Sequence, residues 1–77
     1  MNFIERRTLR VLKDKLKDNP TLKDNRVFLE NAIGKLMENY TLMDDDEQEI
    51  TLERVKEMSN NQLYGILNES ISILENG

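Results

Sequence analysis

Apolar residues recur every three or four positions along three segments of the chain, the spacing that places side chains on one face of an α-helix. In the first segment they fall within an arc of roughly 160° on a helical wheel, and they are Ile4, Leu9, Val11, Leu12 and Leu16. In the second segment they cover about half of the circumference, and they are Leu22, Phe28, Leu29, Ala32, Ile33, Leu36, Met37 and Tyr40. The last segment also covers about half of the circle, with Leu63, Tyr64, Ile66, Leu67, Ile71, Ile73 and Leu74. The pattern predicts three helices that each bury one face.

Capping signals precede the second and third of these helices. Asn19 can cap a helix whose first residue is Pro20, or Thr21 and Asp24 can form a capping box. The run 59–62 is a capping box by residue type, with serine first and glutamine last. The predicted helices therefore cover about residues 3–18, 20–39 and 59–75.

Residues 41–51 carry no helical period. Their two ends are compatible with β-structure, and the acidic residues between them could form the turn of a hairpin. Because an isolated hairpin is marginally stable in water, we expect a loop and keep the hairpin as the alternative. Thr51 can then cap a short helix of about residues 51–58, with Leu52, Val55 and Met58 on its inner face.

The length of 77 residues allows one hydrophobic core, so we expect a single domain over residues 1–77. The predicted fold is all-α: a small antiparallel three-helix bundle with an additional short helix. Because half of the second helix is apolar, we place that helix at the centre, in contact with both neighbours.

The composition argues against an enzyme. The chain has no cysteine and no histidine, which excludes disulfides, thiolate metal sites and the commonest general base. Ser59 is better explained as a helix cap, and Ser70 and Ser72 have no basic residue nearby in the sequence. The three glycines are isolated, so there is no phosphate-binding loop. We expect no catalysis, no cofactor and no metal.

The run of acidic residues from Asp44 to Glu47 does not fit a calcium-binding loop. If Asp44 took the first position of an EF-hand, Glu49 would stand where glycine is required. Val55 would stand where the bidentate glutamate belongs. We therefore interpret the run as a solvated loop.

We expect a cytoplasmic protein. No stretch approaches the roughly 20 apolar residues that span a bilayer, and the first residues lack the apolar region of a signal peptide. Nine asparagines against one alanine and one proline are what AT-rich codons produce. This composition suggests an AT-rich bacterial genome or one of its mobile elements, such as a phage.

Charge is segregated along the chain. Residues 1–26 hold eight basic and four acidic side chains, whereas residues 27–77 hold three basic and eleven acidic ones, for a net charge of −4. On the first predicted helix, five basic residues fall within an arc of roughly 120° on the side away from the leucines. They are Arg6, Arg7, Arg10, Lys13 and Lys17, and we call them the basic face; Lys15 lies outside this arc.

The basic face has four interpretations. It is a solvated surface, or it binds an acidic partner protein, or it contacts nucleic-acid phosphates, or it lies on an anionic membrane. The acidic pI of about 4.8 argues against nucleic acid. A membrane is excluded from our expectation because the core requires the apolar side of this helix.

Acidic residues gather in the second half of the chain. Glu49, Glu53 and Glu57 are spaced by four and would share one helical face, where a cationic surface would relieve their repulsion. The candidate partner-binding residues are therefore Arg6, Arg7, Arg10, Lys13, Lys17, Asp44, Asp45, Asp46, Glu49, Glu53 and Glu57.

A few residues fall outside the helical patterns. Phe3, Val27 and Tyr64 lie away from the centres of the apolar stripes, and neighbouring ones would form an association patch. Gly34 and Gly65 lie in helices, opposite the apolar stripe. We assign these glycines no role; the alternative is close approach of a partner backbone.

These observations favour a non-enzymatic protein-binding module, a small regulator or inhibitor of another macromolecule. Two alternatives remain: a nucleic-acid-binding protein that uses the basic face, and a structural subunit of a homo-oligomeric assembly. In such an assembly the basic part of one copy would meet the acidic part of the next.

Overall fold

A computed structural model describes the backbone of residues 3–76 and the side chains of residues 6–76. It contains four α-helices and one 3₁₀-helix, η1, and no strand occurs within residues 3–76. The elements are α1 (Phe3–Asp18), η1 (Pro20–Asp24), α2 (Arg26–Asn39), α3 (Leu52–Glu57) and α4 (Asn60–Asn76). The all-α fold is therefore confirmed.

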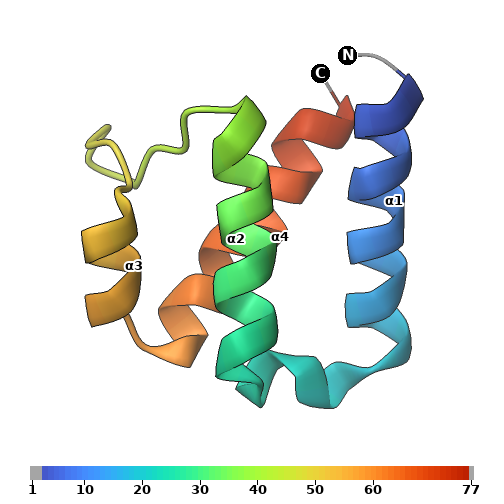
Figure 1. Cartoon of the computed structure of the whole chain (residues 1–77), viewed down its shortest axis with the longest axis horizontal. Coiled ribbons are helices and arrows are strands. Elements are labelled where there is room, and N and C mark those ends of the chain that lie inside the picture. Colours follow the sequence, from blue (N-terminus) through green and yellow to red (C-terminus); the bar gives the residue numbers. More distant parts are fainter. Residues whose placement is uncertain (1–2, 77) are drawn as a thin grey trace.

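The helices are arranged with α1 and α3 on the outside and with α2 and α4 between them (Figure 1). Consecutive α-helices run in opposite directions (Figure 1). The short α3 follows α2 in the sequence and runs in the opposite direction, so α4, which comes next, runs in the same general direction as α2 (Figure 1).

The expectation that the second helix is central is wrong. Helix α4 packs against α1, α2 and η1, whereas α2 packs against α4, η1 and α3. Helix α4 is the longest described helix, with 17 residues, and Leu63, Leu67 and Ile71 are buried along it. Its apolar face is wide enough to cover both α1 and α2.

The core is entirely apolar in the part of the chain whose side chains are described. Its buried residues are Leu9, Leu12, Leu16, Leu29, Ala32, Ile33, Leu36, Leu42, Ile50, Val55, Leu63, Leu67 and Ile71. Eleven of them belong to the apolar faces predicted from the sequence. Leu42 and Ile50 were not predicted as core; they flank the acidic residues and attach that segment to the bundle.

Three residues predicted to face the core are exposed instead, namely Val11, Leu52 and Ile73. Val11 and Ile73 lie at the edges of their apolar arcs, beyond the width that the neighbouring helices cover. Leu52 is the first residue of the six-residue α3, which covers only a small surface. Val27 is exposed, as its position outside the stripe predicted. The side chains of Phe3 and Ile4 lie outside the described part of the chain.

The prediction of one helix over residues 20–39 is wrong, because extended backbone at Asn25 separates η1 from α2. Pro20 begins η1, and Asn19 makes no side-chain capping bond to it. Asn25 instead caps α2, since its side-chain oxygen accepts a hydrogen bond from the backbone N–H of Phe28 at 3.1 Å. Both asparagines have the residue type of a cap, and Asn25 is the one that forms the capping bond.

The caps predicted for the last two helices are confirmed. Thr51 Oγ1 accepts a hydrogen bond from the backbone N–H of Arg54 at 3.3 Å, at the start of α3. Ser59 Oγ accepts from Gln62 N at 3.2 Å, and Gln62 Oε1 accepts from Ser59 N at 2.9 Å. This reciprocal capping box begins α4 one residue from its predicted start.

Candidate functional site

The charged segments lie at opposite ends of the molecule. The Cα atoms extend over 32 × 28 × 18 Å, and the longest axis runs from α1 to α3 and the loop of residues 41–51 (Figure 1). We call this loop the acidic loop. Charge segregation along the sequence has therefore become charge separation in space.

The basic face of α1 is exposed along its whole length, as predicted from the helical wheel. Lys13 is the member of this face with an ion pair among the described residues, at 3.0 Å from the carboxylate of Glu75. Both side chains are about half exposed, so the pair contributes little to stability. The remaining cations of the face are open to a ligand.

At the opposite end, most of the predicted acidic candidates are exposed. They are Asp45, Asp46, Glu49, Glu53 and Glu57, and they lie on the acidic loop and α3. Their carboxylates make no hydrogen bond or ion pair with another described residue. This end of the molecule offers negative charge to a cationic surface.

Asp44 differs from these neighbours because its carboxylate is engaged within the loop. Its oxygens accept hydrogen bonds from the backbone N–H groups of Asp46 at 2.9 Å and Gln48 at 2.8 Å. They also accept one from Arg54 Nη2 at 2.6 Å. The Gln48 bond and the Arg54 guanidinium hold the pKa of Asp44 below its ordinary value. Asp44 thus organises the loop that presents the other carboxylates.

The backbone of the acidic loop has the shape of a hairpin without regular strands. A single antiparallel bridge joins Met43 and Glu49. Asp44 N donates to Gln48 O at 3.0 Å, Glu47 N donates to Asp44 O at 3.0 Å, and Glu47 has a positive φ of 61°. A turn over residues 44–47 whose last residue has a positive φ is the common form of a three-residue hairpin loop, which here consists of residues 45–47. The structure therefore lies between the expected loop and the alternative hairpin.

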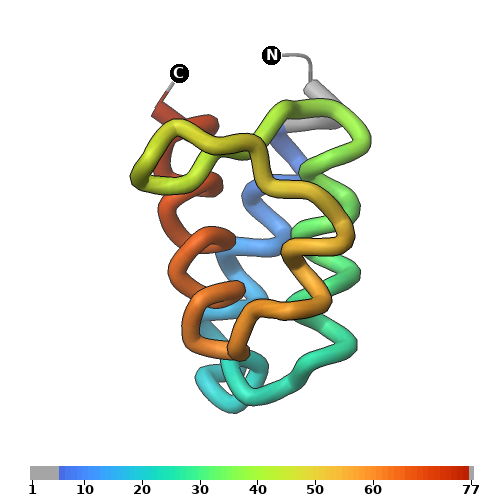
Figure 2. The backbone as a smooth tube through the Cα atoms, turned by 90° about the vertical axis from the view of Figure 1, so that its left-hand side faces the viewer, coloured from blue at the N-terminus to red at the C-terminus, as the bar shows by residue number. Residues whose placement is uncertain are grey.

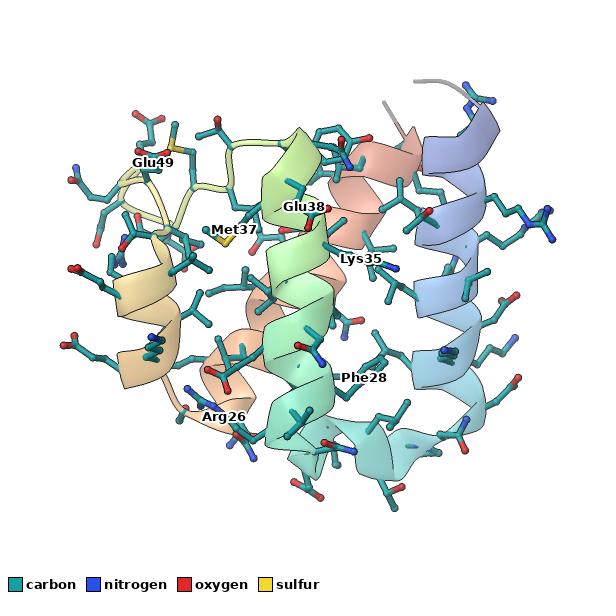
Figure 3. All side chains as sticks on the ribbon, viewed as in Figure 1. Arg26, Phe28, Lys35, Met37, Glu38 and Glu49 are labelled. Carbon is teal, nitrogen blue, oxygen red and sulfur yellow. The ribbon has the colours of Figure 1, made fainter. Side chains whose placement is uncertain are left out.

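Arg26 is a structural residue that the sequence did not single out. From the start of α2, its guanidinium donates to the carbonyl oxygens of Val55 at 2.7 Å, Lys56 at 3.1 Å and Met58. These carbonyls end α3, where four backbone acceptors lack partners within a helix. Figure 3 shows Arg26 at the foot of α2, beside the connection from α3 to α4. Arg26 therefore fixes α3, and with it the acidic end, to the bundle.

An open groove of about 720 Å³ lies between residues 40–46 and one side of α4. We call it the loop–α4 groove. Its apolar lining includes Met43, Ile66, Ile73 and Leu74, and its charged lining consists of Asp44, Asp45, Asp46, Arg54 and Glu69. Figure 2 shows the loop passing beside the second half of α4.

A second open groove, of about 890 Å³, is lined mainly by α1 and α2. Phe28 and Lys35 point from α2 toward α1 in Figure 3. Lys15 and Lys35 are balanced by Glu30 and Glu38 in this lining, so the groove selects no sign of ligand charge.

The described residues contain no group of three or more acidic, histidine or cysteine side chains that could hold a metal ion. None of the helices in this part of the chain has the length and apolar character needed to cross a membrane.

Comparisons with protein families, curated proteins and solved structures find no match to this chain. The charge distribution and the loop–α4 groove are the features that bear on function.

Proposed function

We propose that this protein is a non-enzymatic protein-binding module, a small regulator or inhibitor that acts by occupying another macromolecule. The observation that supports the proposal is that α1, which carries the basic face, and the acidic loop with α3, which carry the exposed carboxylates of Asp45, Asp46, Glu49, Glu53 and Glu57, lie at opposite ends of the longest axis. Complementary potentials of this kind steer encounter and set the orientation of a bound partner.

The distribution of charge differs from that of a surface that serves solubility alone, where both signs are interspersed. Arg6, Arg7 and Arg10 have no acidic partner among the described residues, although the chain has a net negative charge. The exposed carboxylates of the acidic loop and α3 lie at the far end of the molecule, and Asp14 and Asp18 are the acidic residues of α1 whose side chains are described. Each end is therefore a candidate contact surface.

The test is affinity capture from the source cell, followed by mass spectrometry. The first variant carries R6E, R10E and K17E, and it leaves Lys13 in its pair with Glu75. The second carries D45K, E53K and E57K at the acidic end. A control with K23E, K35E and K56E changes the net charge as much as the first variant does, at exposed positions outside α1.

We expect one of the first two variants to reduce capture of a partner at least tenfold, and the control to retain it. Such a loss corresponds to about 1.4 kcal/mol or more of binding free energy. A set of captured proteins that is the same for all variants would contradict the proposal.

The basic face also supports a second candidate, nucleic-acid binding. The specific observation is that the acidic loop and α3 lie at the other end of the molecule, where their repulsion of phosphate is weakest (Figure 1). Binding of this kind would give a shift of DNA or RNA in a gel at about 50 mM salt and would weaken steeply with added salt. The absence of a shift would exclude it.

A third candidate is a head-to-tail assembly, which the opposite charges at the two ends of the long axis favour. Such heterologous contacts build rings or filaments.

A further inference from the structure

We infer that the loop–α4 groove is the partner-binding surface and that its occupant is a basic amphipathic α-helix of another protein. This inference rests on the proposed protein-binding function and names the part of the partner that binds.

The groove exposes large apolar side chains on both of its sides. Met43, on the acidic loop, is 56% exposed, and Ile73, on α4, is 63% exposed. Ile66 and Leu74 are partly buried beside them and pack against the core. Scattered apolar residues are normal on a surface, but large apolar side chains that are exposed on both sides of one groove are typical of a binding site.

The α4 side of the groove is a regular helical face. Its residues form two rows spaced by four, namely Asn61, Gly65, Glu69 and Ile73, and Gln62, Ile66, Ser70 and Leu74. At 1.5 Å per residue, residues 61–74 span roughly 20 Å, the length of a helix of about 13 residues. A Cβ atom at Gly65 would meet nothing within 4 Å, so the middle of this face is open to an approaching helix.

The charge of the lining selects a cationic occupant. It holds four carboxylates and one guanidinium. The guanidinium of Arg54 is already bonded to Asp44 and to the carbonyl oxygen of Glu49, at 2.6 and 2.8 Å. Asp45 and Asp46 on the loop and Glu69 on α4 are exposed. A helix with an apolar stripe flanked by lysines or arginines matches this arrangement.

A second copy of this chain does not supply such a helix. Helix α1 is the basic helix of the described structure, but Leu9, Leu12 and Leu16 of its apolar face are buried in its own core. Among the side chains of α1 that the structure describes, residues 6–18, Val11 is the large apolar one that is exposed. The occupant is therefore a helix of a different protein.

The probe for the test is a synthetic 14-residue peptide of leucine and lysine whose leucines are spaced by three and four. Its binding is measured by fluorescence anisotropy at 0.15 M salt, and its location by amide NMR shifts of the full-length protein. The variants are M43K and I73K. The control V27K introduces the same charge at a position that is 68% exposed and does not line the groove.

We expect the peptide to shift the amide signals of residues 40–46 and of the α4 face. The M43K and I73K variants should each weaken binding about tenfold, since each loses the burial of one large apolar side chain. V27K should stay within twofold of the unmodified protein. A leucine–glutamate peptide with the same spacing should not bind.

With the peptides, the inference would be overturned by no binding of the leucine–lysine peptide, by equal binding of a scrambled leucine–lysine peptide, or by equal weakening by I73K and V27K. The two proposals can fail separately. A captured partner that is lost with R6E, R10E and K17E but retained with I73K would refute the groove assignment and leave the protein-binding function intact. Capture that is the same for all variants would refute the function itself.

Discussion

Asp44 and Arg54 show how one ion pair can order a loop that carries three further acidic residues in succession. The carboxylate of Asp44 accepts two backbone N–H groups, and Arg54 bridges it to the carbonyl oxygen of Glu49. Arg54 thereby joins α3 to both sides of the acidic loop. The ordered loop forms one side of the loop–α4 groove, so in the proposed binding these two residues would act through the position of the backbone.

The low pKa of Asp44 leads to a prediction about pH. A depressed folded-state pKa stabilises the protein above the unfolded pKa of about 3.9, and this contribution is lost as the pH falls through the folded value. We therefore expect D44N to be less stable than the unmodified protein at pH 7, with the difference shrinking below pH 4. Urea unfolding at several pH values measures this difference. D45N, at an exposed neighbour, is the control, and a pH-independent effect of D44N would contradict the prediction.

Glu47 has a backbone conformation that costs a residue with a side chain about 1 kcal/mol. Glycine adopts it without a clash but loses more conformational entropy on folding. We expect E47G to raise the free energy of unfolding by about 0.5 kcal/mol, as the difference between these effects. D46G, at the preceding residue without a positive φ, should not stabilise the protein. The measurement is urea unfolding at pH 7, and destabilisation by E47G would show that the prediction is wrong.

At the scale of elements, α3 is a six-residue helix, too short to be stable on its own. It is held at its first turn by the Thr51 cap, at its end by Arg26, and by the buried Val55 in the middle. The acidic surface therefore depends on contacts that come from α2.

We expect R26A to lower the free energy of unfolding by about 1.5–3 kcal/mol, because it leaves carbonyl oxygens at the end of α3 without a charged donor. R26K keeps the charge but loses the planar fork of donors, and it should fall between R26A and the unmodified protein. R10A, at an exposed position of α1, should change stability by less than about 0.5 kcal/mol. Urea unfolding provides the comparison, and equal stabilities of R26A and R10A would contradict the assigned role.

The sequence predicted elements better than it predicted their junctions and contacts. Helical periodicity and the caps at Thr51 and Ser59 identified α3 and α4 nearly to the residue, because these signals are local. The break at Asn25 was missed since Asn19 is an equally good cap by type. Arg26 contacts residues about 30 positions away in the sequence, and a local sequence pattern does not predict contacts between such distant residues.

At the scale of the whole molecule, the sequence predicted that charge is segregated but not where the two sets lie. Their separation follows from the path of the chain, which puts α1 and α3 at opposite ends. The loop–α4 groove was not predicted for the same reason. Met43 and Ile73 line one groove although 30 residues separate them, and Ile73 was expected in the core.

The two charged ends also give a prediction for association of the protein with itself. If copies bind head to tail, raising the salt from 0.1 to 1 M should dissociate them, because the Debye length falls from about 10 to 3 Å. Sedimentation velocity at the two concentrations measures the change. A monomer at both would exclude the assembly.

The purely aliphatic interior has a consequence for how this fold would appear in another genome. Hydrocarbon side chains of similar volume replace one another at a modest cost in stability, so the core positions can accept several substitutions at once. Asn25, Arg26, Asp44 and Arg54 have no such freedom, since each satisfies particular backbone groups. A distant homologue would be recognised by these four polar residues at their spacing more readily than by its apolar core residues.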